Sequence, residues 1–208
     1  MVFALWQTPF VVPLKILIVF FHELSHALAT IVTGGEVVSL SVSPDQGGLV
    51  LSRGGNRFIT LSAGYLGSLL IGVALLVSAS RSKADRVVMA GLGIVTLVMA
   101  GLYVRETFVL GFTIGAGVVM LLFARFLGHA ANDLVLRVIG LTSVIYVPFD
   151  IFSDTIARSE LRSDARMLAE EFGGTTILWG ILWLLISLVV IAWCFRRGLG
   201  RNSNITLH

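Results

Sequence analysis

Residues 10–32 have the sequence FVVPLKILIVFFHELSHALATIV, in which Lys15 near the start and then two histidines with a glutamate interrupt a mostly apolar run. A helix that crosses the hydrocarbon core of a membrane needs about 20 mostly apolar residues, and this run is long enough. Residues four apart share one face of a helix, so His22 and His26 would point the same way, with Glu23 beside them. Ionisable residues inside a membrane span are costly to bury, which makes these three the first candidates for a functional site.

The composition extends the membrane assignment to the whole chain. Its 208 residues are 56% hydrophobic and only 13% charged, and the mean hydropathy is +0.94. A water-soluble domain is nearer about 25% charged. The net charge of +3 does not indicate nucleic-acid binding, because the basic residues are few and lie between apolar spans. We therefore predict a multi-pass integral membrane protein that has the lipid bilayer, and no nucleic acid, as a partner.

Six apolar stretches are long enough to span a membrane: 10–32, 58–79, 86–104, 107–127, 134–152 and 175–195. We expect the first to be a retained helix and no cleaved signal, because residues 1–14 contain no Lys or Arg. The third and fourth are separated only by Arg105-Glu106-Thr107, which predicts a tight helical hairpin. The predicted fold is an all-α polytopic membrane protein. Residues 1–195 form a single domain with its core at 10–155, and 196–208 form a disordered tail.

The segment between the first two spans has a different pattern. Val38, Leu40 and Val42 alternate with serines, and a turn sequence, Pro44–Gly48, separates them from a second alternating run. Period-2 alternation around a turn predicts a β-hairpin over residues 36–52. A plain connecting loop is the alternative at this stage.

The segment 156–174 is the longest polar stretch. Its apolar residues, Leu161, Ala165, Leu168 and Phe172, recur at helical spacing, and glycines follow them. This pattern predicts an amphipathic surface helix at the membrane edge, just before the last span.

Small residues recur at four-residue intervals in two of the spans. The second span has Gly64, Ser68 and Gly72, and the fourth has Gly111 and Gly115. Such stripes let helix backbones approach closely in a membrane, so we expect both stripes to pack against neighbouring helices.

The segment His22–His26 has the H-E-x-x-H pattern in which two histidines bind zinc and the glutamate handles the proton of a water. Because Cys194 is the only cysteine, any zinc must be held by histidines and carboxylates. A catalytic site usually has a third protein ligand. Asp150 and Asp154 are the leading candidates, since they lie one helical turn apart at the end of the fifth span. We expect Pro148 to break the helix just before them, and a broken backbone inside a membrane is tolerated only beside protein or a wet cavity.

These residues resemble the motifs of the site-2 protease family of intramembrane zinc metallopeptidases, especially its small single-domain bacterial-type branch. The first motif is fully matched, and the predicted hairpin follows it in the family's order. Gly64–Ser68 stands at the family's G-P-x-x-N-like motif, with Tyr65 in place of Pro and Ser68 in place of Asn. Pro148–Ile151 stands at its Pro-containing L-D-G motif, with Phe before the Asp and Ile after it. By order of elements, the resemblance covers roughly residues 10–155.

The resemblance implies a zinc-dependent endopeptidase that cleaves a peptide bond of a transmembrane substrate inside the membrane, the cell membrane if the source is bacterial. Its single Zn²⁺ would be held by His22, His26 and Asp150, with Asp154 as the alternative to Asp150. Glu23 would be the general base that takes a proton from the metal-activated water. Contacts with the substrate are expected at Ser68, Leu40 and Val42, the hairpin holding the substrate as an added strand.

Two other classes of function remain open from the sequence. One is a non-proteolytic metal-binding membrane protein that transports an ion or serves as a regulatory scaffold, and the other is a zinc hydrolase that acts on a lipid or a small amide. Transport is disfavoured because the third, fourth and sixth spans are almost free of charge.

Overall fold

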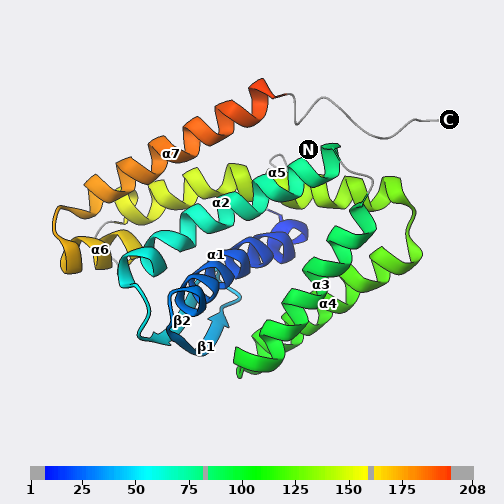
Figure 1. Ribbon diagram of the computed structural model, residues 1–208, viewed down its shortest axis with the longest axis horizontal. Helices are drawn as coiled ribbons and strands as arrows, with labels where there is room; N and C mark the ends of the chain where they lie inside the picture. The colour runs from blue at the N-terminus through cyan, green and yellow to red at the C-terminus, as the bar shows by residue number, and fades with distance from the viewer. Residues whose placement is uncertain (1–7, 82–83, 159–161, 198–208) are drawn as a thin grey trace.

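The computed structural model describes residues 8–81, 84–158 and 162–197, and this part of the chain is mostly helical (Figure 1). The helices are α1 (Val12–Val32), α2 (Arg57–Arg81), α3 (Asp85–Tyr103), α4 (Thr107–Phe126), α5 (His129–Phe152), α6 (Asp164–Phe172) and α7 (Thr176–Arg196), and the strands are β1 (Glu36–Val42) and β2 (Gly48–Arg53). A 3-10 turn, Pro9–Val11, precedes α1, and a π-helical turn, Ser153–Ala157, follows α5. The predicted tail lies outside the described residues from position 198 onward.

Six helices in the described ranges are long and apolar enough to cross a membrane, which confirms the predicted spans. The fifth differs most from its prediction, because it begins at His129 and continues to Ala157. The predicted break at Pro148 is wrong: α5 runs through it, and the irregular turn comes afterwards. Val144, Val147 and Ile151 pack into the same core cluster as residues of α2 and α7. We attribute the continuity to this packing, which compensates for the hydrogen bond that proline removes.

The hairpin predicted for residues 36–52 is confirmed. β1 and β2 pair antiparallel, with Leu40 opposite Val50 and Val42 opposite Gly48, and an irregularity lies between Val37 and Ser39. Leu40 and Val42 are 1% exposed and belong to the same core cluster as the apolar residues of α1. The hairpin is therefore held to α1 by the inner face of β1.

Helix α1 lies near the centre of the molecule, as Figure 1 shows, with α2 and α5 between it and α7, and with α3 and α4 on another side. Two clusters of buried side chains hold the helices together. The first joins α1 and β1 to residues of α2, α3, α4 and α5, and the second joins α2 and α5 to α6 and α7.

Glycines mark the closest approaches between helices. A side chain on Gly72 of α2 would meet the carbonyl oxygen of Gly140 on α5, and a side chain on Gly140 would meet that of Gly72. Gly93 of α3 and Gly117 of α4 are paired in the same way. The prediction for Gly111 and Gly115 is wrong, because no described atom of another element lies near either of them. The face of α4 that meets its neighbour is the one that carries the buried residues Thr113 and Gly117.

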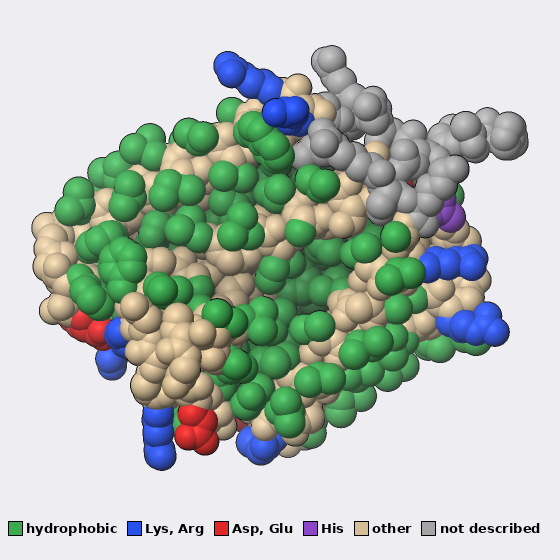
Figure 2. Space-filling view, in the orientation of Figure 1, with side chains coloured by type: hydrophobic (Ala, Val, Ile, Leu, Met, Phe, Trp, Pro, Cys, Tyr) green, Lys and Arg blue, Asp and Glu red, His purple; other side chains and the backbone are tan. Residues whose placement is uncertain are grey.

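Apolar side chains cover the middle of the face drawn in Figure 2, and charged side chains gather toward its edges. The exposed apolar residues include Leu185 and Val189 on α7 and Leu122 on α4. A surface of this kind is stable against lipid and would be unstable in water. The protein is accordingly an integral membrane protein with several spans.

Candidate metal centre

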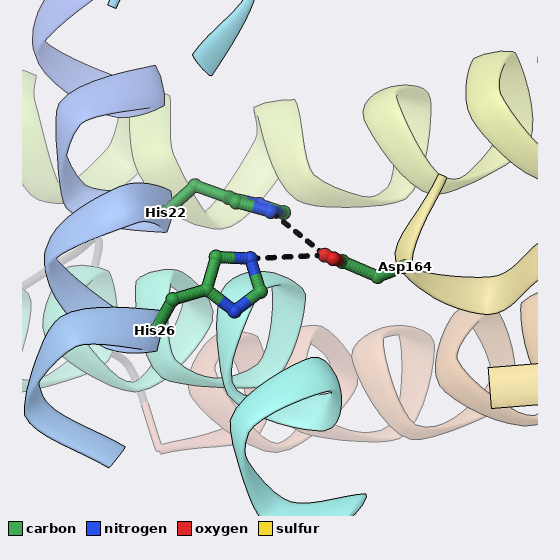
Figure 3. A group of neighbouring side chains, drawn as sticks. All are labelled: His22, His26 and Asp164. Carbon is green, nitrogen blue, oxygen red and sulfur yellow. Dashed lines mark hydrogen bonds and ion pairs between the residues drawn. The ribbon is translucent and has the colours of Figure 1, made fainter. Parts of the chain in front are cut away.

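Three side chains from two distant parts of the chain converge at one point (Figure 3). His22 and His26 lie one turn apart on α1, and Asp164 is the first residue of α6. The Nε2 atom of His22 lies 3.0 Å from Oδ2 of Asp164, and Nε2 of His26 lies 3.1 Å from the same oxygen. His26 and Asp164 are buried, and His22 is partly buried.

The N-terminus of α6 fixes the position of the Asp164 carboxyl group. Ser163 caps the helix, since the backbone N–H of Arg166 donates a hydrogen bond to its Oγ. Ala165 and Leu168 are fully buried and anchor the inner face of α6. Burial alone would raise the pKa of Asp164, but the neighbouring His26 and His22 outweigh it, so that the pKa lies below its usual range. The carboxyl group is therefore ionised at neutral pH, which is the form that binds a metal.

The histidine rings are oriented by their neighbours. Nδ1 of His26 lies 2.7 Å from the carbonyl oxygen of Thr60. A carbonyl oxygen only accepts hydrogen bonds, so Nδ1 carries the proton of this bond and the lone pair of the neutral ring is on Nε2. The ring of His22 packs edge-on against Tyr65, with centroids 4.7 Å apart.

The donor set suits a zinc ion. In the described part of the chain, one group of three or more His, Cys, Asp or Glu residues brings its ligand atoms within 4.8 Å of one another, and it consists of these three residues. Zinc bonds of about 2.0–2.1 Å in a tetrahedral site place neighbouring ligand atoms about 3.3 Å apart. The separations from Asp164 are close to that value, and three lone-pair atoms that face one another need a cation or protons between them.

Glu23 lies next to the histidines in the same cavity. Its side chain is 5% exposed, and its carboxyl group lies against Gly48 at the start of β2. The cavity has a volume of about 1410 Å³, and β2, the start of α2, the end of α5 and α6 line it together with α1. A buried carboxylate beside a possible metal site, with room for a peptide, is what a metallopeptidase requires.

The sequence matches the protein family described as peptidase M50B-like over residues 1–194. The chain belongs to this family. The resemblance to site-2 proteases is thereby confirmed, and it covers nearly the whole chain. No curated protein and no solved structure matches the chain.

Membership of the M50B-like family implies a metallopeptidase, and the family is typically zinc-dependent. The carboxylate that meets the histidines, however, is neither of those expected from the sequence. Asp150 and Asp154 line the same cavity, but the group around the histidines contains Asp164. Asp154 accepts hydrogen bonds from the hydroxyl of Tyr65 at 2.8 Å and from Arg158 at 2.7 Å.

Ser68, Leu40 and Val42, at which the sequence predicts substrate contacts in this M50B-like protein, are not among the described residues that line the cavity. Ser68 is buried and donates its hydroxyl hydrogen bond to the carbonyl oxygen of Gly64, within α2. Leu40 and Val42 are in the core beneath the hairpin. The strand at the cavity is β2, which contributes Gly48, Val50 and Ser52 to its lining.

One signal in the sequence could have indicated Asp164. It precedes Leu168 by four residues, so it lies on the apolar face of the amphipathic helix that the sequence predicts. A carboxylate on an apolar face is costly unless it is paired. The amphipathic pattern by itself predicts only a surface helix at the membrane edge.

Proposed function

We propose that this protein is a zinc-dependent intramembrane endopeptidase in which His22, His26 and Asp164 hold one Zn²⁺. The observation that carries the proposal is the convergence of these three ligand atoms beside the buried Glu23, in a cavity among membrane-spanning helices. Asp150 stays a candidate ligand from the sequence, and the geometry favours Asp164 over it.

Glu23 is the general base of the proposed reaction. A bound zinc ion supplies Lewis-acid chemistry, lowering the pKa of a water and polarising a carbonyl oxygen. Glu23 accepts the proton of the attacking water and passes it to the nitrogen of the leaving amine. The hydrogen bond from His26 to Thr60 keeps the imidazole in the tautomer that binds a metal through Nε2.

The substrate we propose is a membrane-spanning segment that unwinds locally before it is cut, because a helix keeps its backbone groups paired internally. The free edge of β2 offers such a segment an added-strand position inside the cavity. In this proposal β2 takes the role that the sequence suggested for Leu40 and Val42.

The test is a Glu23→Gln substitution assayed with a tagged single-span reporter. The reporter has about 20 apolar residues and a central Gly-Pro pair that weakens its helix. We expect wild-type protein to cleave the reporter, and Glu23→Gln to retain one zinc ion per chain and to lose at least about 100-fold in cleavage rate.

A variant that cleaves at the wild-type rate would remove Glu23 from the reaction. If metal-loaded wild-type protein leaves the reporter intact, the result contradicts the peptidase proposal. It would favour a metal-binding membrane protein without proteolytic activity.

A further inference from the structure

A second cavity lies between α5 and α7, and it shares no lining residue with the cavity of the metal centre. Its volume is about 130 Å³. Arg137 is the lining residue nearest the start of α5, and Phe195 is the one nearest the end of α7. Because α5 and α7 run in opposite directions (Figure 1), these two residues mark the same end of the cavity. From Arg137 to Ile145 the cavity follows α5 for about 12 Å.

The cavity opens sideways, toward the lipid. Leu141 and Phe195, which line it, are both exposed on the surface of membrane-spanning helices. Most of the other lining side chains are apolar as well. An apolar lining alone does not select a ligand in a membrane, because the surrounding lipid tails are equally apolar. Any selection among lipids must therefore come from the charges at the end of the cavity.

The surface at that end is basic. Arg196 and Arg197 directly follow Phe195, and both are exposed. Arg86 at the start of α3 and Arg125 at the end of α4 are exposed at the same end of the helices. Basic side chains are visible along the upper and right-hand edges of Figure 2. The two arginines that close α7 are the ones nearest the cavity.

The carboxylates at this end do not offset the exposed arginines. Among the described residues there, the acidic ones are Asp85 and Asp133, and both are fully buried. Oδ2 of Asp85 lies 2.7 Å from Nδ1 of His129, and Oδ2 of Asp133 lies 2.8 Å from Nε of Arg137. Each carboxylate is thus held inside the protein by a partner on α5, and an anion that approaches from the membrane surface meets arginines.

We propose that this cavity binds one anionic phospholipid. Part of an acyl chain lies between α5 and α7, and the headgroup phosphate lies against Arg196 and Arg197. Guanidinium groups bind phosphate through charge-assisted, often bidentate hydrogen bonds, and clusters of basic residues at the end of a span bind acidic headgroups. A zwitterionic lipid offers the same tail and phosphate, but its ammonium group is repelled by the arginines.

Native mass spectrometry of protein released from lipid nanodiscs tests the charge selection. The nanodiscs contain equal amounts of phosphatidylglycerol and phosphatidylethanolamine. We expect wild-type protein to retain one phosphatidylglycerol per chain and at least about 5-fold less phosphatidylethanolamine, because a cation near an anionic surface contributes about 5-fold in affinity.

Two double variants locate the headgroup. Arg196→Gln with Arg197→Gln should lower the retained phosphatidylglycerol by about 10-fold or more. Arg86→Gln with Arg125→Gln is the control, because it removes the same charge from α3 and α4, which lie away from α7 in Figure 1. The control should retain the lipid as wild type does.

A pair of tryptophan variants on α5 locates the acyl chain. Leu141→Trp fills the cavity and should lower lipid retention by at least about 5-fold. Leu134→Trp is the control, because Leu134 is exposed on the same helix but does not line the cavity. Zinc content should equal the wild-type value in all four variants, since none of them touches the metal centre.

Several results would overturn the proposal. Equal losses in the two double variants would mean that only the general surface charge attracts lipid, and full retention in Leu141→Trp would mean that no chain enters the cavity. Retention of both lipids alike would remove the charge selection. Lipid retained only after deletion of residues 198–208 would assign the cavity to the chain's own tail, and a lipid-free dimer would assign it to a second copy.

Discussion

At the scale of single residues, the candidate centre depends on two glycines as much as on the proposed ligands, because a larger residue at either position would overlap the site. Gly64 on α2 faces the metal-binding edge of both histidines, and Gly48 on β2 faces Glu23. The carbonyl oxygen of Thr60 orients His26 from the same end of α2. Helix α2 therefore brings a bare backbone surface to the H-E-x-x-H turn, and this surface leaves space for the ligands.

Replacing Gly64 by Ala should abolish zinc binding without unfolding the protein. The added methyl group would overlap Nε2 of His22 and Nε2 of His26, while alanine favours a helix over glycine by about 1 kcal/mol. We expect less than about a tenth of the wild-type zinc content by elemental analysis, with an unchanged circular dichroism spectrum. Gly111→Ala, which faces open space, is the control. Full zinc content in Gly64→Ala would show that the ligand atoms bind elsewhere.

At the scale of elements, α6 is a short helix outside the membrane spans that carries Asp164, the third of the proposed ligands. An ion pair, Arg57 with Glu171, joins it to α2 at 3.0 Å, but both side chains are about 40% exposed. Exposed pairs of this kind contribute about 0–1 kcal/mol. The apolar contacts of Ala165 and Leu168 in the second core cluster are therefore what holds Asp164 in place.

Leu168→Ala should weaken zinc binding by about 10-fold or more, because truncating a buried leucine costs about 2–5 kcal/mol and loosens α6. Arg57→Ala should change zinc affinity by less than about 5-fold. Competition with a chromophoric chelator measures both dissociation constants. A larger effect for Arg57→Ala than for Leu168→Ala would show that the ion pair is the main attachment of α6.

Helices α3 and α4 form a hairpin, and they approach each other most closely at Gly93 of α3 and Gly117 of α4. Gly117→Val should force the helices apart and destabilise the protein by about 1–3 kcal/mol, whereas Gly115→Val faces open space and should not. Zinc content should remain at the wild-type value in both, because α4 packs mainly on α3. Thermal unfolding in detergent compares the two, and equal midpoints would contradict the packing of α3 on α4 through Gly117.

The elements were predictable from the sequence because their signals are local. An apolar run long enough for a membrane, an alternation of Val, Leu and Ser in β1, and two histidines one turn apart each lie in a short window. Asp164 lies 142 residues from His22, so that only the tertiary fold brings the two together. For the same reason, the sequence could not indicate which glycines of α4 meet α3, or that packing would carry α5 through Pro148.

At the scale of the whole molecule, the candidate centre lies between the two clusters of buried side chains, to both of which α2 and α5 contribute. Helix α1 contributes only to the first cluster, and α6 contributes only to the second. A metal ion shared by His22, His26 and Asp164 would join α1 directly to α6. Metal binding should therefore stabilise the interface between α1 and α6 more than the rest of the protein.

Removing zinc with a chelator should accordingly raise amide hydrogen exchange in α6 and in the histidine turn of α1, and change exchange in α3 and α4 little. A ligand at 1,000 times its dissociation constant stabilises the state that binds it by about 4 kcal/mol. Mass spectrometry of peptides from the exchanged protein provides the comparison. A uniform rise along the chain would mean that zinc does not act at this interface.

The most direct test of the central claim is the zinc stoichiometry of purified wild-type protein, Asp164→Asn and Asp150→Asn, measured side by side. We predict one zinc ion per chain in wild type and in Asp150→Asn, and at most a small fraction of one in Asp164→Asn. Zinc that persists in Asp164→Asn but is lost in Asp150→Asn, or a wild-type protein that binds no zinc at all, would contradict the account.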